Sequence, residues 1–175
     1  SCNTSFAQLG VELGADALQE QAEKFGFNEH YLDDIGPQAI SRFPDGANEP
    51  QAGQSAIGQF EVRATPLQMA MVAAGIANQG VVMKPYLVDE IKSPKLDVIG
   101  KTEPQQMPDQ PALGSAAARD LTQMMVAVVE GGTGRTAQIP GVQVAGKTGT
   151  AQSSPDRPPY AWFVSLAMEQ TPAVA

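Results

Sequence analysis

Cysteine and histidine are almost absent from the sequence, with one of each, Cys2 and His30, among 175 residues. A single cysteine excludes a disulfide within the chain, and Cys2 is expected to be a small buried side chain rather than a reactive thiol. One histidine in a polar segment offers no cluster of ligands with the spacing of a metal site. The sequence therefore predicts neither a disulfide framework nor a metal centre.

Long apolar runs and positive charge are scarce as well. The longest apolar run covers residues 69–77, far short of the roughly 20 residues that a membrane-spanning helix needs. The 11 Lys and Arg residues are outnumbered by 19 Asp and Glu, which gives a net charge of -8 and argues against binding to nucleic acid or to an anionic membrane surface. The hydrophobic content of 42% suffices for a globular core, and the length fits one domain or part of a larger one.

Residues 142–152, which read VQVAGKTGTAQ, are the most informative stretch of the chain. They are alternating and β-branched between two turn signals, a pattern that predicts a strand. Gly146 and Gly149 pack nothing in a strand interior, and such glycines often mark the close approach of another backbone or of a ligand. Gly149 in particular is expected to leave room for a substrate backbone that lies along the strand.

Lys147, Thr148 and Thr150 place one cation and two hydroxyl groups beside these glycines. Such a strand suits an extended peptide that ends in a carboxylate, because the peptide can add to the sheet edge while its charge is bound at the end. A single lysine on an exposed strand is usually only solvated, so this pattern needs a second signal.

The second signal is Ser-Cys-Asn at residues 1–3, directly before a helical pattern. Ser-x-Asn alone is equally compatible with a helix N-cap, a position that both Ser and Asn favour. Its combination with Lys-Thr-Gly at residues 147–149 is more specific, because motifs of these two kinds belong to the signature of penicillin-binding proteins and class A β-lactamases.

The wider sequence resembles a class B penicillin-binding protein over nearly the whole chain. The matching segments are GGTG at 131–134, AGKTGTAQ at 145–152, TPLQMA at 65–70, ANQG at 77–80 and YAWFV at 160–164. The detail is most similar to the actinobacterial penicillin-binding protein A group. One departure is large: no Ser or Thr is followed by Lys three residues later, so the Ser-x-x-Lys nucleophile motif of the family is missing.

The resemblance implies an α+β fold of the penicillin-binding protein and serine β-lactamase type, in which helices pack on an antiparallel sheet, here incomplete at both ends. Residues 1–175 are expected to be the C-terminal part of one transpeptidase domain, beginning after its nucleophile. A second polypeptide segment carrying Ser-x-x-Lys is expected in the same particle, and this chain alone is expected to be inactive.

The activity implied by the resemblance is peptidoglycan D,D-transpeptidation. A serine attacks the penultimate D-alanine carbonyl of a stem peptide and releases the terminal D-alanine, and an amine of a neighbouring stem then takes the acyl group. β-Lactams mimic the first substrate, and no metal or organic cofactor is required.

The same resemblance implies partners and a location. The expected partners are stem peptides on a lipid-linked precursor or nascent glycan, β-lactam antibiotics, the missing segment with the nucleophile, and cell-division or elongation proteins, but no nucleic acid. The expected location is extracytoplasmic, anchored to the cell membrane through an N-terminal segment that this sequence does not contain.

The family's site residues carry over to five further positions. Ser1 would relay a proton to the leaving amine, and Asn3 would hold the substrate amide. Lys147 would stabilise the substrate carboxylate and set the field at the serine, and the hydroxyls of Thr148 and Thr150 would hydrogen-bond that carboxylate. The backbone N–H of Thr150 would supply half of the oxyanion hole.

Two other functions remain open for the same motifs. A β-lactamase or β-lactam sensor of the same fold would not cross-link stem peptides, although the TPLQ segment at residues 65–68 favours the synthase. A non-catalytic cell-wall scaffold with a relict site would lack the nucleophile altogether, and sequence upstream of Ser1 would identify it.

Local patterns also predict the order of the elements. Helices are expected over residues 4–13, 17–25, 65–77 and 115–129, and strands over residues 81–83, 86–91, 142–152 and 160–167. Thr65 is expected to cap its helix, with Pro66 at the first position and Gln68 completing a capping box. Turn signals predict that residues 28–60 are irregular and that residues 92–113 form an exposed excursion.

Overall fold

A computed structural model describes residues 2–32, 36–152 and 156–168 of the chain. Its elements are α1 (Asn3–Leu13), α2 (Ala15–Lys24), α3 (Glu49–Ser55), α4 (Pro66–Ala77), β1 (Glu90–Lys92), β2 (Val98–Lys101), α5 (Ser115–Glu130), the short 3-10 helix η1 (Arg135–Ala137), β3 (Gln143–Ala151) and β4 (Tyr160–Met168). Both strand pairs, β1–β2 and β3–β4, are antiparallel. The predicted α+β class with an antiparallel sheet packed against helices is confirmed.

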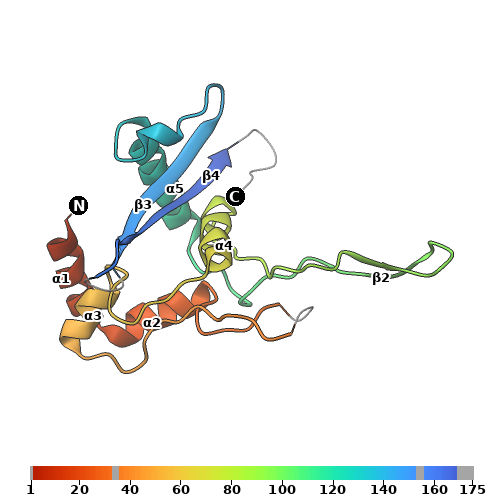
Figure 1. The fold of residues 1–175 in the computed structure, drawn as a ribbon, viewed down its shortest axis with the longest axis horizontal. Coiled ribbons are helices and arrows are strands. Elements are labelled where there is room, and N and C mark those ends of the chain that lie inside the picture. Colours follow the sequence, from red (N-terminus) through yellow and green to blue (C-terminus); the bar gives the residue numbers. More distant parts are fainter. Residues whose placement is uncertain (1, 33–35, 153–155, 169–175) are drawn as a thin grey trace.

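The β3–β4 pair and the helices beside it form one centre of the fold. The two strands run in register from the pair Gln143–Met168 to the pair Ala151–Tyr160. Ala145 and its cross-strand partner Leu166 are buried against Met125 of α5. Figure 1 shows α5 along this sheet and α4 beside it. The amino-terminal half of β3 therefore belongs to the core, and it anchors the half that follows.

The start of α4 agrees with its predicted cap, except for one side chain. The Thr65 hydroxyl accepts a hydrogen bond from the backbone N–H of Gln68 at 3.1 Å, and Pro66 fills the first helical position. The capping-box prediction for Gln68 is wrong, because its fully buried amide donates instead to the carbonyl of Phe25 at 2.6 Å. The backbone N–H of Thr65 donates to the hydroxyl of Ser41. This tertiary hydrogen bond replaces the one that the Gln68 side chain would accept in a capping box.

The helix α3 lies inside the segment predicted to be irregular, and Pro50 explains the error. Proline breaks a helix interior, but it is tolerated in the first turn, where its missing N–H has no helical partner. Asn48 caps this helix: its side-chain oxygen accepts from the N–H of Gln51 at 3.1 Å, and its own N–H donates to the Gln51 side chain at 2.9 Å. The polar residues that resembled a loop form a reciprocal capping box.

Replacing Asn48 by alanine is expected to lower the free energy of unfolding by about 1 kcal/mol, because the side-chain half of this capping box is lost. Chemical denaturation followed by circular dichroism measures the change. Gln54→Ala in the same helix is the control, since Gln54 is exposed and should stay within about 0.5 kcal/mol of wild type. Equal stability of wild type and Asn48→Ala would show that the capping box contributes nothing.

The strands predicted between residues 81 and 91 are mostly wrong. Residues 81–83 form no strand, although Met83 makes an isolated antiparallel bridge to Gln106. The pairing cannot extend past Pro85, which has no N–H to donate. Regular pairing begins only at β1, and β2 lies inside the predicted excursion.

The β1–β2 hairpin projects away from the rest of the molecule (Figure 1). Its aliphatic side chains are exposed, among them Ile91, Val98 and Ile99, and the tip residue Leu96 is 78% exposed with a φ of 69°. The prediction that residues 92–113 leave the body of the domain is confirmed for this part.

The helices predicted over residues 4–13 and 17–25 correspond to α1 and α2. The helix over residues 115–129 and the strand over residues 160–167 are confirmed as α5 and β4. Cys2 was expected to be buried but is exposed, because it precedes α1 at the surface.

Candidate substrate strand and its surroundings

The carboxyl-terminal half of β3 carries the predicted substrate-binding residues. Lys147, Gly149 and Thr150 are exposed and Thr148 is half-buried, whereas residues 144–146 are buried. In the described part of the chain β3 pairs with β4 alone, so no strand covers its other edge. An uncovered strand edge presents N–H and C=O groups that an extended ligand can bind.

The ammonium group of Lys147 is held close to its own strand. Its Nζ donates to the backbone carbonyl of Thr148 at 2.5 Å, and no ion pair between described residues includes it. A compact ammonium on a flexible stem can exchange this neutral acceptor for an anion. The structure therefore places an exposed ammonium group beside the strand.

The hydroxyl of Thr148 has a partner that sequence reasoning missed. Thr133 Oγ1 lies 2.9 Å from Thr148 Oγ1, and either hydroxyl can be the donor. Thr133 belongs to the glycine-rich turn that follows α5, whose sequence GGTG contributes to the family resemblance. A hydroxyl between two glycines shortly before this strand was the available signal.

The two glycines of β3 have different surroundings. A Cβ atom on Gly146 would lie 2.6 Å from the Phe163 ring, so this glycine permits the ring to pack on the strand. A Cβ on Gly149 would meet one atom, Cβ of Trp162, at 3.3 Å, and the φ of Gly149 is not positive. Gly149 is therefore not required by an unusual backbone angle.

The carboxyl end of β3 lies next to the segment that follows α3. Gln59 Nε2 donates to the carbonyl of Thr150 over 3.4 Å. The helix α3 packs on α1, and Figure 1 shows this end of β3 pointing toward both helices. The structure thus brings the amino-terminal helices close to the strand with the Lys-Thr-Gly motif.

Of the predicted Ser-x-Asn residues, the structure describes Asn3 but not Ser1. Asn3 is exposed and occupies the first position of α1, and the N-cap residue is Cys2, which makes no side-chain capping bond. Asn3 is therefore not the N-cap residue of α1. Ser1 lies outside the described residues, so its predicted role as a proton relay stays a prediction.

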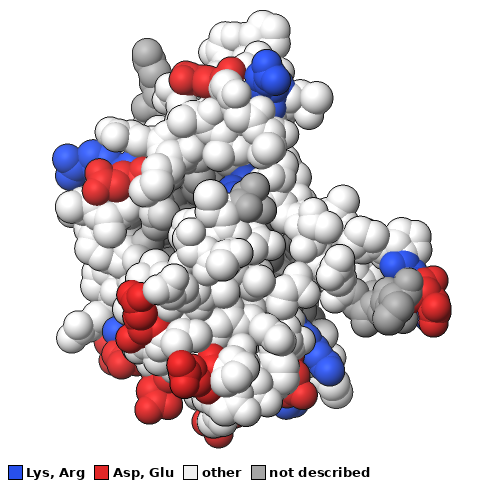
Figure 2. Space-filling view, turned by 90° about the vertical axis from the view of Figure 1, so that its left-hand side faces the viewer, with Lys and Arg blue, Asp and Glu red and all other residues white. Residues whose placement is uncertain are grey.

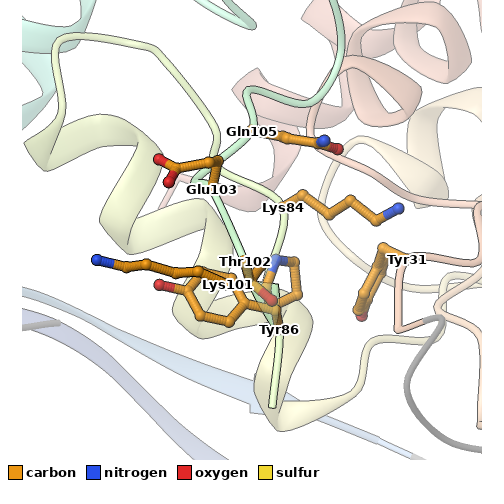
Figure 3. Close-up of a pocket in the computed structure, with 8 residues that line it drawn as sticks. Tyr31, Lys84, Tyr86, Lys101, Thr102, Glu103 and Gln105 are labelled. Carbon is orange, nitrogen blue, oxygen red and sulfur yellow. The ribbon is translucent and has the colours of Figure 1, made fainter. Parts of the chain in front are cut away.

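A separate cavity of about 370 Å³ contains none of these residues. It is lined by Tyr31, Lys84, Pro85, Tyr86, Lys101, Thr102, Glu103 and Gln105. Figure 3 shows that its charged groups diverge, since Lys84 extends toward Tyr31 while Lys101 and Glu103 point to the opposite side. Groups that do not converge on one point cannot act on one reacting atom.

Charges are distributed unevenly over the surface. Figure 2 shows a mostly uncharged face with acidic side chains concentrated toward its lower end. A hydrogen bond from Lys24 lowers the pKa of Glu20, an exposed pair on α2.

In the described ranges no three His, Cys, Asp or Glu side chains are placed to hold a metal ion. The helices described there are too short or too polar to cross a membrane.

Comparison with curated proteins finds relatives that match along the whole chain. The chain is 42% identical over 183 residues to the peptidoglycan D,D-transpeptidase PbpA of Mycolicibacterium smegmatis, and the match covers 100% of this chain and 36% of that protein. It is 40% identical over 185 residues to PbpA of Mycobacterium tuberculosis, with the same coverage. The chain thus spans about a third of the length of these curated relatives.

Solved structures show the same likeness in three dimensions. The imipenem acyl-enzyme complex of penicillin-binding protein A from M. tuberculosis matches with a TM-score of 0.85 and 40% identity, over 95% of this chain and 37% of that one. A D,D-transpeptidase domain from Eggerthella lenta matches with a TM-score of 0.81 and 36% identity, over 94% of this chain and 42% of that one.

The family described as "Penicillin binding protein transpeptidase domain" matches residues 1–175. The match therefore includes β3, β4 and the helices that pack beside them. The chain belongs to the penicillin-binding protein transpeptidase domain family.

Proposed function

We propose that this chain supplies the substrate-carboxylate site of a peptidoglycan D,D-transpeptidase that works through a serine acyl-enzyme. The observation that carries the proposal is the exposed half of β3, where an ammonium and two hydroxyl-bearing residues follow a buried anchor. The relatives named as D,D-transpeptidases match the whole chain, which supports the same chemistry here.

Each residue of the strand has a distinct role in this proposal. Lys147 binds the terminal carboxylate of the stem peptide or of a β-lactam through its positive charge. Thr148 and Thr150 hold the same carboxylate through their hydroxyls. The backbone N–H of Thr150 stabilises the oxyanion that develops when the carbonyl is attacked. Gly149 has no side chain, which leaves space for the substrate backbone beside the strand.

Ser1 and Asn3 are the remaining residues of the proposed site. Ser1 relays the proton to the departing D-alanine amine, and Asn3 holds the substrate amide. The attacking serine is not provided by a Ser-x-x-Lys motif of this sequence, so acylation is proposed for the full-length protein. A solved relative is an acyl-enzyme complex with penicillin G, which supports β-lactams as ligands.

We further propose that residues 1–175 are part of one transpeptidase domain and act outside the cytoplasm, where peptidoglycan is cross-linked. The single family match over 1–175 supports the first point, and the cell-wall activity named for the relatives supports the second. Stem peptides of lipid-linked precursor or nascent glycan are the proposed substrates.

Penicillin labelling of the full-length protein tests the function. A fluorescent penicillin is expected to form a persistent adduct whose mass equals protein plus drug, because a synthase releases the acyl group slowly to water. The protein should also release D-alanine from a pentapeptide stem when an acceptor amine is present. Rapid penicillin hydrolysis without a lasting adduct would favour the β-lactamase, and neither reaction would favour a scaffold.

A further inference from the structure

We propose that Thr133 is a positioning residue for substrate-carboxylate binding, acting through the hydroxyl of Thr148. The inference rests on the proposed function and extends the site beyond the strand to the turn after α5. Its basis is the 2.9 Å contact between Thr133 Oγ1 and Thr148 Oγ1. Thr133 does not need to touch the substrate for this role.

The turn that carries Thr133 is fixed to the end of α5. The N–H groups of Gly132 and Gly134 both donate to the carbonyl of Val128, at 3.1 and 3.0 Å. A Cβ on Gly132 would lie 2.9 Å from this carbonyl oxygen, and a Cβ on Gly134 would lie 3.3 Å from the Phe163 ring. The two glycines therefore let the turn pack tightly on the helix and the sheet, with Thr133 between them.

A second anchor holds the same turn from its far side. The side-chain amide of Gln138 donates to the carbonyls of Val129 and Glu130 at 2.9 and 3.1 Å. These are carbonyls of the last turn of α5, which lack helical partners. Hydrogen bonds to α5 therefore fix the backbone on both sides of Thr133. This holds the Thr133 hydroxyl next to Thr148 of β3.

The hydroxyl pair can direct a proton toward a bound anion. Each threonine hydroxyl has one proton and two acceptor lone pairs. When Thr133 donates to Thr148, the proton of Thr148 is left for the substrate carboxylate, and the two bonds in a row polarise each other. Without Thr133 the Thr148 hydroxyl can rotate, and part of its orientation is lost before the substrate arrives.

The test compares two ligands in full-length variants. Benzylpenicillin carries the free carboxylate, and its methyl ester lacks that charge. Thr133→Val is expected to lower the second-order acylation rate for benzylpenicillin by about tenfold, the effect of one hydrogen bond in a charged network, and to change the rate for the ester little. Thr133→Ser should restore the wild-type rate for benzylpenicillin, because it restores the hydroxyl.

Two controls separate positioning from folding. Thr136→Val alters another exposed threonine, in η1, and should leave both rates unchanged. In a Thr148→Val background, Thr133→Val should have no further effect, because the group it positions is gone. Thermal unfolding of each variant shows whether the fold is retained.

The outcomes distinguish this inference from the proposed function. Equal loss for both ligands, no loss for either, or failure of serine to rescue would overturn the role of Thr133 while leaving a penicillin-binding enzyme. Absence of any adduct in the wild-type protein would instead refute the function on which the inference rests.

Discussion

Lys147→Ala is expected to lower the second-order rate of penicillin acylation in the full-length protein by about 100- to 1,000-fold, a loss of the same order as removal of one oxyanion-hole donor from an enzyme. The ammonium is the only charged group on the exposed half of β3. Loss of the ammonium removes the proposed partner of the ligand carboxylate. It also changes the electrostatic potential around the reacting serine. The rate is measured by time-resolved labelling with a fluorescent penicillin.

Folding should hardly respond to Lys147→Ala. The side chain is exposed, and its hydrogen bond within the described residues goes to the neighbouring carbonyl of Thr148, so its contribution to stability is expected to be below about 0.5 kcal/mol. Lys101→Ala is the matched control, since Lys101 is an exposed strand lysine in β2. A variant that unfolds, or that labels as fast as Lys101→Ala, would remove Lys147 from the substrate site.

Gly149→Ala is expected to lower the rate of acylation while changing the free energy of unfolding little. The φ of Gly149 is not positive, and its new Cβ would make one tight contact, 3.3 Å to Cβ of Trp162. Stability should therefore stay within about 1 kcal/mol of wild type, with the stiffer unfolded chain offsetting part of the contact. Acylation should fall about 100-fold, because a displacement of about 1 Å in the ligand is enough for such a loss.

Gly100→Ala in β2 is the control for Gly149→Ala. A Cβ on Gly100 would make ordinary contacts of 3.6 Å with Ile91, so both labelling and melting temperature should stay near wild type. Thermal unfolding and penicillin labelling are measured on the same samples. If Gly149→Ala melts and labels like wild type, the ligand does not approach this part of the strand.

The predictions from sequence succeeded where local chemistry decides the structure. The hydroxyl of Thr65 and the fixed φ of Pro66 start α4 through local interactions, and alternation over residues 142–152 was enough to predict β3. Proline at position 50 shows the limit of such rules, because its effect depends on where in the helix it falls. Sequence alone did not place Pro50 in a first turn.

The predictions failed where a distant contact decides the structure. Gln68 had a local role available in a capping box, but the carbonyl of Phe25 holds its amide instead. The pairing of Thr133 with Thr148 is of the same kind, since it depends on how the end of α5 meets β3. The β3 strand could be predicted from its own residues, whereas the contact between its Thr148 and the turn after α5 became visible only in the fold.

The β1–β2 hairpin is expected to open locally more readily than the rest of the fold. Its two strands make their main contacts with each other, and a two-stranded ribbon in water is only marginally stable. Its backbone amides should therefore exchange with deuterium through local opening, at a free energy far below that of global unfolding. The amides of residues 144–146, buried beneath α5, should exchange among the last. Opening of the ribbon should then leave β3 in place, and the two regions are expected to exchange independently.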